Sequence, residues 1–227
     1  MPSTLRSIDK LVTYERVLSN VAIAENVRYL EVDVSLDFSA GQCVALDLGG
    51  IARYYSIASG EDEAVGILYD VVPGGKLTPR LASLSPGDVV GVSPPFGSFV
   101  DKTDGSVWIA TGTGIAPFRS MIRSGRSATL LLHGSRNFSG MYFQDELCAA
   151  LGPRYVPCVS RPGRDEAGAL ERAGAYIGRL TARLREKGTD RSARHYVCGS
   201  AAMVVDVRDL LVGLGVPFDN IESEIYF

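Results

Sequence analysis

Apolar and polar residues alternate in short runs over the first part of the chain, a pattern typical of strands with one buried face. Turn signals such as Ser39-Ala40-Gly41 separate these runs. We expect the strands within residues 10–20, 27–35, 42–49, 53–59, 64–72 and 88–93. Segments of this length and spacing predict a small antiparallel β-barrel, interrupted by one helix over residues 77–84.

The rhythm changes to alternating strands and helices beyond the polar, glycine-containing segment 101–106. Strands are expected at 106–111, 128–134, 154–160, 194–199 and 221–227, and helices at 116–125, 140–151, 175–188 and 201–215. This alternation predicts an α/β Rossmann-like parallel sheet, with residues 162–175 as an irregular excursion. The chain therefore divides into two expected domains, residues 1–102 and 103–227.

Composition and charge narrow the class of protein. Of the 227 residues, 46% are apolar and 22% are charged, which is ordinary for a globular chain and excludes a disordered one. The net charge of −3 argues against nucleic-acid binding. Since no apolar run approaches the roughly 18 residues of a membrane span, we expect a cytoplasmic protein without membrane association. We also expect a monomer.

The cysteines and histidines predict no metal centre. The four cysteines are too widely scattered for zinc or an iron–sulfur cluster; they are Cys43, Cys148, Cys158 and Cys198. His133 and His195 each stand alone beside a strand end, where a structural role is the simpler interpretation.

A glycine-rich turn joins the first strand and helix of the second domain. It reads Ala110-Thr-Gly-Thr-Gly-Ile-Ala-Pro117, and its glycines let backbone N–H groups approach a phosphate closely. Pro117 replaces the third glycine of the common dinucleotide motif, and the next strand ends at His133-Gly134 without an acidic residue for a ribose. The turn predicts a pyrophosphate site but disfavours a typical NAD dehydrogenase; a turn needed only for packing is the alternative.

The barrel carries two further candidate segments. Arg53-Tyr54-Tyr55-Ser56 offers a guanidinium, aromatic rings and a hydroxyl, which together suit a phosphate and a planar heterocycle. Gly75-Lys76-Leu77-Thr78 begins the predicted helix and offers N–H groups to a phosphate. The alternative for residues 53–56 is a barrel strand with a buried tyrosine and a surface arginine.

Taken together and in this order, the motifs resemble the ferredoxin–NADP reductase family, and its compact bacterial members most of all. The resemblance covers nearly the whole chain. It rests on Arg-x-Tyr-Ser at 53–56, Gly-Lys-Leu-Thr at 75–78, Gly-Thr-Gly-x-x-Pro at 112–117, Val-Ser-Arg at 159–161, Cys-Gly at 198–199 and Glu-x-Tyr at 224–226.

The resemblance implies roles for the barrel residues toward FAD. Tyr55, beside Tyr54, would stack on the isoalloxazine, and Ser56 would hydrogen-bond near flavin N5. Arg53 would pair with the pyrophosphate, which would also be held at Gly75, Lys76, Leu77 and Thr78. FAD is inferred from these two phosphate-holding motifs, with FMN left open.

The second domain would bind the nicotinamide nucleotide. Gly112, Thr113 and Gly114 would hold its pyrophosphate. Ser160 and Arg161 suit a 2′-phosphate, which favours NADP(H), and Tyr176 would stack on adenine. Gly174 stands where plant-type members carry a lysine, and the candidates to compensate are Arg164 and Arg179.

The remaining roles concern hydride transfer. The resemblance implies that Cys198 and Gly199 border the nicotinamide and that Glu224 acts as a charge and proton partner. Tyr226 or Phe227 would cover the flavin as a lid, or would only close the last strand.

The function implied is transfer of hydride from NADPH to FAD and of single electrons to a separate ferredoxin or flavodoxin. The alternatives are a reductase component supplying an oxygenase, a free-flavin reductase, or a non-catalytic electron-transfer subunit. An acidic acceptor would fit a basic rim, for which the candidates are Lys76, Arg80, Arg119, Arg123 and Arg126; a solvated helix face explains them equally well.

Overall fold

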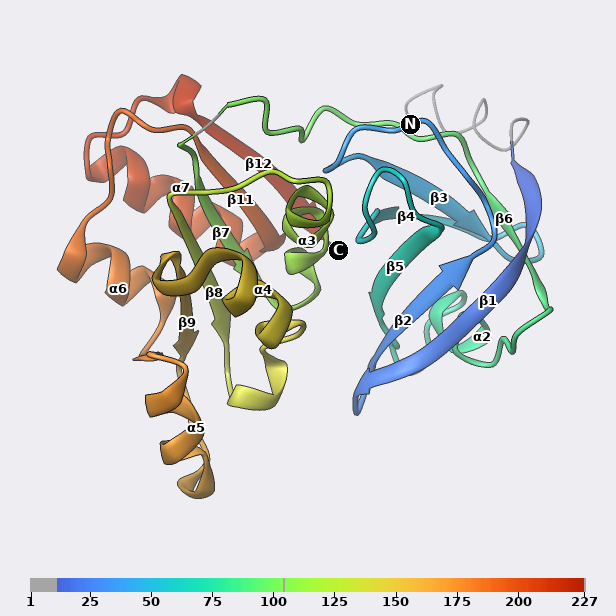
Figure 1. Cartoon of the computed structure of the whole chain (residues 1–227), viewed down its shortest axis with the longest axis horizontal. Coiled ribbons are helices and arrows are strands. Elements are labelled where there is room, and N and C mark those ends of the chain that lie inside the picture. The colour runs from blue at the N-terminus through green and yellow to red at the C-terminus, as the bar shows by residue number, and fades with distance from the viewer. Residues whose placement is uncertain (1–11, 104, 227) are drawn as a thin grey trace. The chain divides into compact units, whose positions relative to one another are not determined.

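The computed structural model describes residues 12–103 and 105–226. Its contacts divide the chain into two compact units (Figure 1). The first unit comprises Met1–Val100 and Ala116–Ser124, and the second comprises Asp101–Ile115 and Gly125–Phe227. Each unit is built around its own sheet.

The first unit is an antiparallel barrel of six strands, as predicted. Its strands are β1 (Thr13–Ala24), β2 (Val27–Val32), β3 (Cys43–Asp47), β4 (Ala52–Ser56), β5 (Val65–Asp70) and β6 (Val89–Val92). They are ordered β4-β3-β6-β1-β2-β5, with antiparallel neighbours throughout. The two ends of this order meet where Ile57 bridges Ile67 and the Ala58 N–H donates to the Gly66 carbonyl at 2.7 Å.

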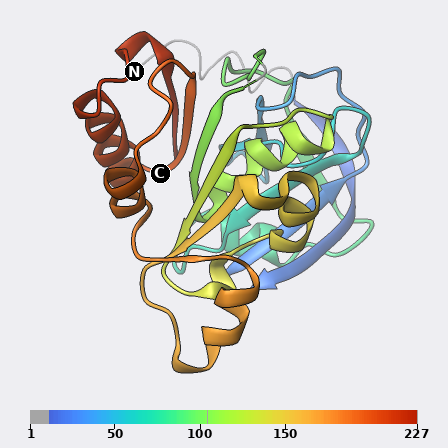
Figure 2. The same ribbon diagram turned by 60° about the vertical axis from the view of Figure 1, so that its left-hand side comes forward.

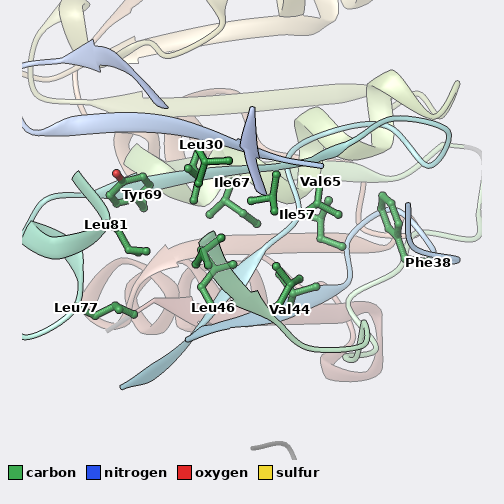
Figure 3. Packing of buried hydrophobic residues seen from close by; sticks show 14 residues of the cluster. Leu30, Phe38, Val44, Leu46, Ile57, Val65, Ile67, Tyr69, Leu77 and Leu81 are labelled. Atoms are coloured by element: carbon green, nitrogen blue, oxygen red, sulfur yellow. The ribbon is translucent and has the colours of Figure 1, made fainter. Parts of the chain in front are cut away.

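The core of the barrel follows from the alternation in the sequence. Figure 3 shows inward-facing side chains of several strands in one apolar cluster, which includes Leu30, Leu46 and Ile67. The short helix α2 (Thr78–Ala82) lies within the predicted span and packs Leu81 into this cluster. Burial of that leucine fixes α2 on the barrel.

Helix α3 (Ala116–Arg123) is held to the barrel strands by polar contacts as well as apolar ones. Its Arg119 is buried, donates to the Tyr29 hydroxyl and the Ala58 carbonyl at 2.9 and 3.0 Å, and lies over the Tyr29 ring. The Ser120 hydroxyl donates to the Ser59 carbonyl at 2.7 Å. These bonds satisfy a cation that would otherwise be costly to bury.

The second unit contains a six-stranded parallel sheet, which confirms the predicted fold class. Its strands are β7 (Val107–Thr111), β8 (Leu130–Ser135), β9 (Tyr155–Val159), β10 (Tyr176–Ile177), β11 (His195–Ser200) and β12 (Ile221–Tyr226). They are ordered β10-β9-β8-β7-β11-β12, so the chain winds outward in both directions from β7. The helices that belong to this unit are α4 (Gln144–Leu151), α5 (Ala167–Arg172), α6 (Leu180–Lys187) and α7 (Ala201–Gly213).

Helices cover both faces of this sheet (Figure 2). Helices α6 and α7 pack on one face, where Leu184 and Val207 meet strand residues such as Leu132. The next residue along β8, His133, points to the opposite face, where its Nδ1 lies 3.0 Å from the hydroxyl of Tyr155. Burial lowers the pKa of His133 to about 3, so it is neutral at pH 7.

Two local expectations are wrong. Residues 162–175 are not wholly irregular, because α5 lies within them and buries Leu170 against Val159. The segment 175–188 is not helical from its start, because Tyr176 and Ile177 form a strand paired with β9. In both places a tertiary contact outweighs the local pattern.

Among the described residues, no helix is long and apolar enough to cross a membrane. The same residues contain no group of three metal-ligating side chains.

Candidate functional site

Strand β4 carries the Arg-x-Tyr-Ser residues, and they become more buried toward its end. Arg53 and Tyr54 are exposed, Tyr55 is half-buried, and Ser56 is buried. The Tyr55 ring packs on the barrel core with its centroid 6.3 Å from that of Tyr69, in an edge-to-face arrangement. Burial raises the pKa of Tyr55 to about 12, so the phenol is neutral and offers a rigid, planar surface.

Ser56 lies opposite Cys43 across the β3–β4 pair. The Ser56 Oγ and Cys43 Sγ are 3.4 Å apart, and both side chains are buried. The hydroxyl is therefore held at the end of β4 by a neighbour on β3.

The loop before α2 forms a cradle of backbone donors. The Gly75 N–H donates to the Val72 carbonyl at 2.9 Å, and the Thr78 hydroxyl accepts from the Val72 N–H at 2.9 Å. The described residues supply no acceptor for the next three backbone N–H groups, those of Lys76, Leu77 and Thr78. Three successive unsatisfied donors suit a phosphate group, and exposed Arg53 belongs to the same unit.

Asn20 fixes the far end of α2, a contact that the sequence did not predict. Its Nδ2 donates to the carbonyls of Leu81 and Leu84 at 2.8 and 3.0 Å. Its Oδ1 accepts from the Tyr69 hydroxyl and from the Arg28 Nε, each at 3.1 Å. The residue thus links α2 to the tyrosine that packs against Tyr55.

In the second unit, the glycine turn lies directly against the end of β11. The turn Gly112–Ile115 follows β7, and Thr113 within it is buried. A Cβ on Gly114 would lie 2.5 Å from the Cys198 carbonyl oxygen, and one on Gly199 would lie 2.4 Å from the Thr111 hydroxyl. The structure therefore brings the Gly-Thr-Gly and Cys-Gly motifs together, and only glycine permits this approach.

The last strand, β12, places two more of the predicted site residues beside the carboxyl end of β11. Cys198 on β11 is flanked by Ala110 on β7 and by Glu224 on β12. Tyr226, two residues further on, pairs with Ser200. Phe227 lies outside the described residues.

The carboxyl ends of β8, β9 and β10 carry a row of arginines. The Ser160 N–H donates to the Ser135 carbonyl at 3.0 Å, and the Arg161 N–H donates to the Arg136 carbonyl at 2.6 Å. Gly178 donates to Val159 at 2.8 Å, which brings the end of β10 beside β9. The row consists of Arg136, Arg161 and Arg179.

All three arginines of the row are exposed, and the described part of the chain gives none of their side chains a hydrogen-bond or ion-pair partner. Arg136 was missed by the sequence reasoning. The signal available in the sequence was the dipeptide Ser135-Arg136. It stands at the end of β8 as Ser160-Arg161 stands at the end of β9.

Tyr176 lies at the edge of the same sheet, beside Cys158. Its hydroxyl donates to Glu186 at 2.6 Å, which raises the pKa of Tyr176. A Cβ on Gly178 would lie 2.6 Å from the ring. The tyrosine is thus held in place at the edge of the sheet.

The structure removes Arg119 from the predicted basic rim and engages Arg123 and Arg126 in contacts within the protein. Arg119 is buried against Tyr29. Arg123 binds Glu63 through Nε and Nη2, and lowers the pKa of that carboxyl. Arg126 donates to the Asp101 carbonyl at 2.7 Å. Only the other two candidates, Lys76 and Arg80, are exposed without such a contact among the described residues.

Comparison with known families assigns both units. Residues 10–100 match the oxidoreductase FAD-binding domain model, and residues 108–209 match the oxidoreductase NAD-binding domain model. A ferredoxin–NADP reductase B of Sorangium cellulosum is 35% identical over 208 residues, which cover 83% of this chain and 85% of that protein. The reductase component 1 of a Comamonas terephthalate 1,2-dioxygenase is 29% identical over 99% of this chain and 72% of that protein.

The fold is also that of a solved reductase. A ferredoxin–NADP⁺ reductase from Neisseria gonorrhoeae with bound FAD and NADP superposes with a TM-score of 0.80 at 23% identity, covering 95% of this chain and 99% of that one. These matches agree with the motifs of both units. The chain belongs to the ferredoxin–NADP reductase family and is an oxidoreductase with an FAD-binding and a nicotinamide-dinucleotide-binding domain.

Proposed function

We propose that this protein takes hydride from NADPH and delivers electrons one at a time to a separate ferredoxin or flavodoxin. The observation that carries the choice of NADPH is the row Arg136, Arg161 and Arg179 on adjacent strand ends. When bound, FAD supplies the conversion between hydride and single-electron chemistry. The chain's own residues bind the two nucleotides, orient their reacting rings and exchange protons.

The barrel holds the flavin dinucleotide. The backbone N–H groups of Lys76, Leu77 and Thr78 donate to the pyrophosphate, and Arg53 neutralises its charge. The Tyr55 ring supports one face of the isoalloxazine. Ser56 would hydrogen-bond to the flavin near N5. These assignments are supported by the three unsatisfied donors and by the neutral, core-packed phenol.

The second unit holds the nicotinamide nucleotide. The backbone of Thr113 and Gly114 binds its pyrophosphate, where the absence of a side chain on Gly114 permits close approach. Cys198 and Gly199 border the reacting ring, and Glu224, paired in register with Cys198, is proposed as a charge and proton partner. Tyr226 is proposed as the lid.

The row of arginines selects NADPH over NADH. A guanidinium binds a phosphate dianion through two parallel hydrogen bonds, whereas NADH carries only an uncharged 2′-hydroxyl at that position. Ser160 adds a hydroxyl, and Tyr176 stacks on adenine. No carboxylate stands at residues 135, 136, 160 or 161 to repel the phosphate.

A second candidate function is the reductase component of an oxygenase. It is favoured by the Comamonas relative, whose match extends over nearly the whole of this chain. The two candidates share the proposed flavin and nucleotide chemistry and differ only in the acceptor.

The experiment is an anaerobic titration of the purified, FAD-loaded protein with NADPH, followed in the visible spectrum. We expect bleaching of the flavin bands by one equivalent of NADPH, and slower bleaching by NADH. Turnover is then compared with ferredoxin, with flavodoxin and with ferricyanide. Absence of bound flavin, or no bleaching by either nucleotide, refutes the proposal; reduction of ferricyanide but of neither protein favours the oxygenase role.

A further inference from the structure

We propose that Asn20 is a positioning residue for the flavin ring, acting through Tyr69 on Tyr55. The inference rests on the proposed function, in which the Tyr55 ring supports one face of the isoalloxazine. Asn20 lies on β1, and Tyr69 lies on β5 of the same barrel. The two side chains are joined by a hydrogen bond of 3.1 Å from the Tyr69 hydroxyl to the Asn20 Oδ1.

The orientation of the Asn20 amide is fixed by its partners. Its Nδ2 donates to the carbonyls of Leu81 and Leu84 at the far end of α2. The Arg28 Nε donates to the Asn20 Oδ1 at 3.1 Å, and the Arg28 Nη2 donates to the Asn20 backbone carbonyl. An amide has two donor and two acceptor positions, and all four are used here once the Tyr69 hydroxyl is included. The oxygen is therefore held toward Tyr69.

The Tyr69 hydroxyl depends on this oxygen. Tyr69 is 1% exposed, so solvent offers no substitute for a lost partner. Arg28, the other polar side chain at the Asn20 oxygen, carries only donors and cannot accept the phenol proton. Because an unmet buried hydroxyl costs free energy, the bond to Asn20 keeps the tip of the Tyr69 ring in its present place.

Tyr69 in turn limits where the Tyr55 ring can lie. The two ring centroids are 6.3 Å apart and the rings are inclined by 74°, which is an edge-to-face contact. Half-buried Tyr55 packs against the core cluster to which Tyr69 belongs. A tilt of the Tyr69 ring therefore changes the plane that Tyr55 offers to a stacked ligand.

The hydroxyl of Tyr69 supplies direction rather than packing. A phenylalanine at this position would fill nearly the same volume of the core. The hydroxyl adds an attachment between the tip of the ring and a fixed point on β1. A stacking surface must be held in a defined plane, so this attachment suits a residue that lies behind the support of a planar heterocycle.

Substitutions at both ends separate this role from a general loss of structure. Tyr69→Phe removes the hydroxyl and keeps the ring. Asn20→Leu removes the acceptor at similar volume, whereas Asn20→Asp keeps an acceptor for Tyr69 and Arg28 but loses both donors to α2. Asn26→Asp, at an exposed position in the turn after β1, is the matched control for changing an amide to a carboxylate.

The experiment uses the FAD-loaded protein, with visible circular dichroism of the bound flavin and the FAD dissociation constant as readouts. We expect Tyr69→Phe and Asn20→Leu to alter the dichroism bands, and Tyr69→Phe to weaken FAD binding by about two- to tenfold, the factor that one ordinary hydrogen bond supplies. Asn20→Asp and Asn26→Asp keep the dichroism of the wild type. In a Tyr55→Ala background, Tyr69→Phe and Asn20→Leu change the dichroism no further, because the ring that transmits their effect is gone.

The inference is overturned if Tyr69→Phe leaves the dichroism unchanged, if Asn20→Asp alters it as Asn20→Leu does, or if the changes persist in the Tyr55→Ala background. Should Asn20→Leu fail to fold, Tyr69→Phe with and without Tyr55→Ala decides the question. A wild-type protein that binds no FAD, or whose flavin is not reduced by NADPH, instead refutes the proposed function. The two failures are therefore distinct.

Discussion

The row of arginines makes a quantitative prediction about nucleotide choice. Arg136 and Arg161 follow neighbouring strands, and the Arg161 N–H is bonded to the Arg136 carbonyl. We therefore expect Arg161→Ala and Arg136→Ala each to weaken binding of a 2′-phosphorylated nucleotide, and to leave its counterpart without that phosphate nearly unchanged.

The magnitude follows from the exposure of both residues. A hydrogen bond to a charged group contributes about 1.5–3 kcal/mol. Since both guanidinium groups are exposed, the lower end applies, about 1.5 kcal/mol or roughly tenfold in the dissociation constant. The double variant should lose up to about a hundredfold, and less if the two groups bind the same phosphate oxygens.

The assay is calorimetric titration with adenosine 2′,5′-bisphosphate and with 5′-AMP. Arg185→Ala is the control, because Arg185 is an exposed arginine in the last turn of α6 and lies away from the strand ends. Added salt should weaken the bisphosphate in the wild type more than in the double variant, because the arginine–phosphate attraction is screened. Arg161→Lys should keep part of the affinity, since it retains charge without the planar fork.

Two results would refute the reasoning. Equal losses for both ligands would mean that Arg136 and Arg161 are structural. Unchanged affinity for the bisphosphate in the double variant would mean that the 2′-phosphate binds elsewhere in the protein, or that the natural nucleotide is NADH.

Three further predictions concern the second unit. His133 has a folded pKa of about 3 and an unfolded value of about 6.5, so the unfolded chain binds the extra proton and stability falls as the pH falls. In urea unfolding, His133 should contribute about 2 kcal/mol to the loss of stability from pH 7 to pH 5, and His133→Gln should remove that contribution. An unchanged pH slope in that variant would contradict this assignment. Gly114→Ala should weaken nucleotide binding at least about tenfold while FAD still binds, because its Cβ would lie 2.5 Å from the Cys198 carbonyl oxygen; normal titration with the bisphosphate counts against this. Trp108→Phe should lower the free energy of unfolding by about 2–3 kcal/mol, because Trp108 Nε1 donates to buried Asp101 at 2.8 Å; a denaturation midpoint equal to that of the wild type would exclude this role.

The fold could be predicted largely from local signals. The period of two in the barrel and the strand–helix alternation beyond residue 105 predicted both sheets. The expected β-strand at 53–59 and helix at 77–84 fell on β4 and α2 because a tyrosine, a buried leucine and a proline near the helix start have strong local preferences.

Prediction from the sequence failed where a contact with a residue distant in the chain determines the local structure or role. Tyr176 and Ile177 form a strand only because β9 offers them a free edge. Arg136 could not be recognised from its own surroundings, because its proposed role comes from lying beside Arg161. Asn20 likewise gains its role from carbonyls more than sixty residues away.

Arg119 shows the physical origin of such failures and bears on how a partner protein is recognised. A basic residue on a helix is normally solvated, so the sequence placed Arg119 on a rim for acidic partners. The structure buries it, where the Tyr29 hydroxyl, the Ala58 carbonyl and the Tyr29 ring face compensate for lost hydration. Arg123 is also engaged, in an ion pair with Glu63 that partly neutralises its charge. Among the five candidates, Lys76 and Arg80 are the two that are exposed without such a contact among the described residues. We therefore expect a weaker attraction for an acidic protein than five free cations would supply.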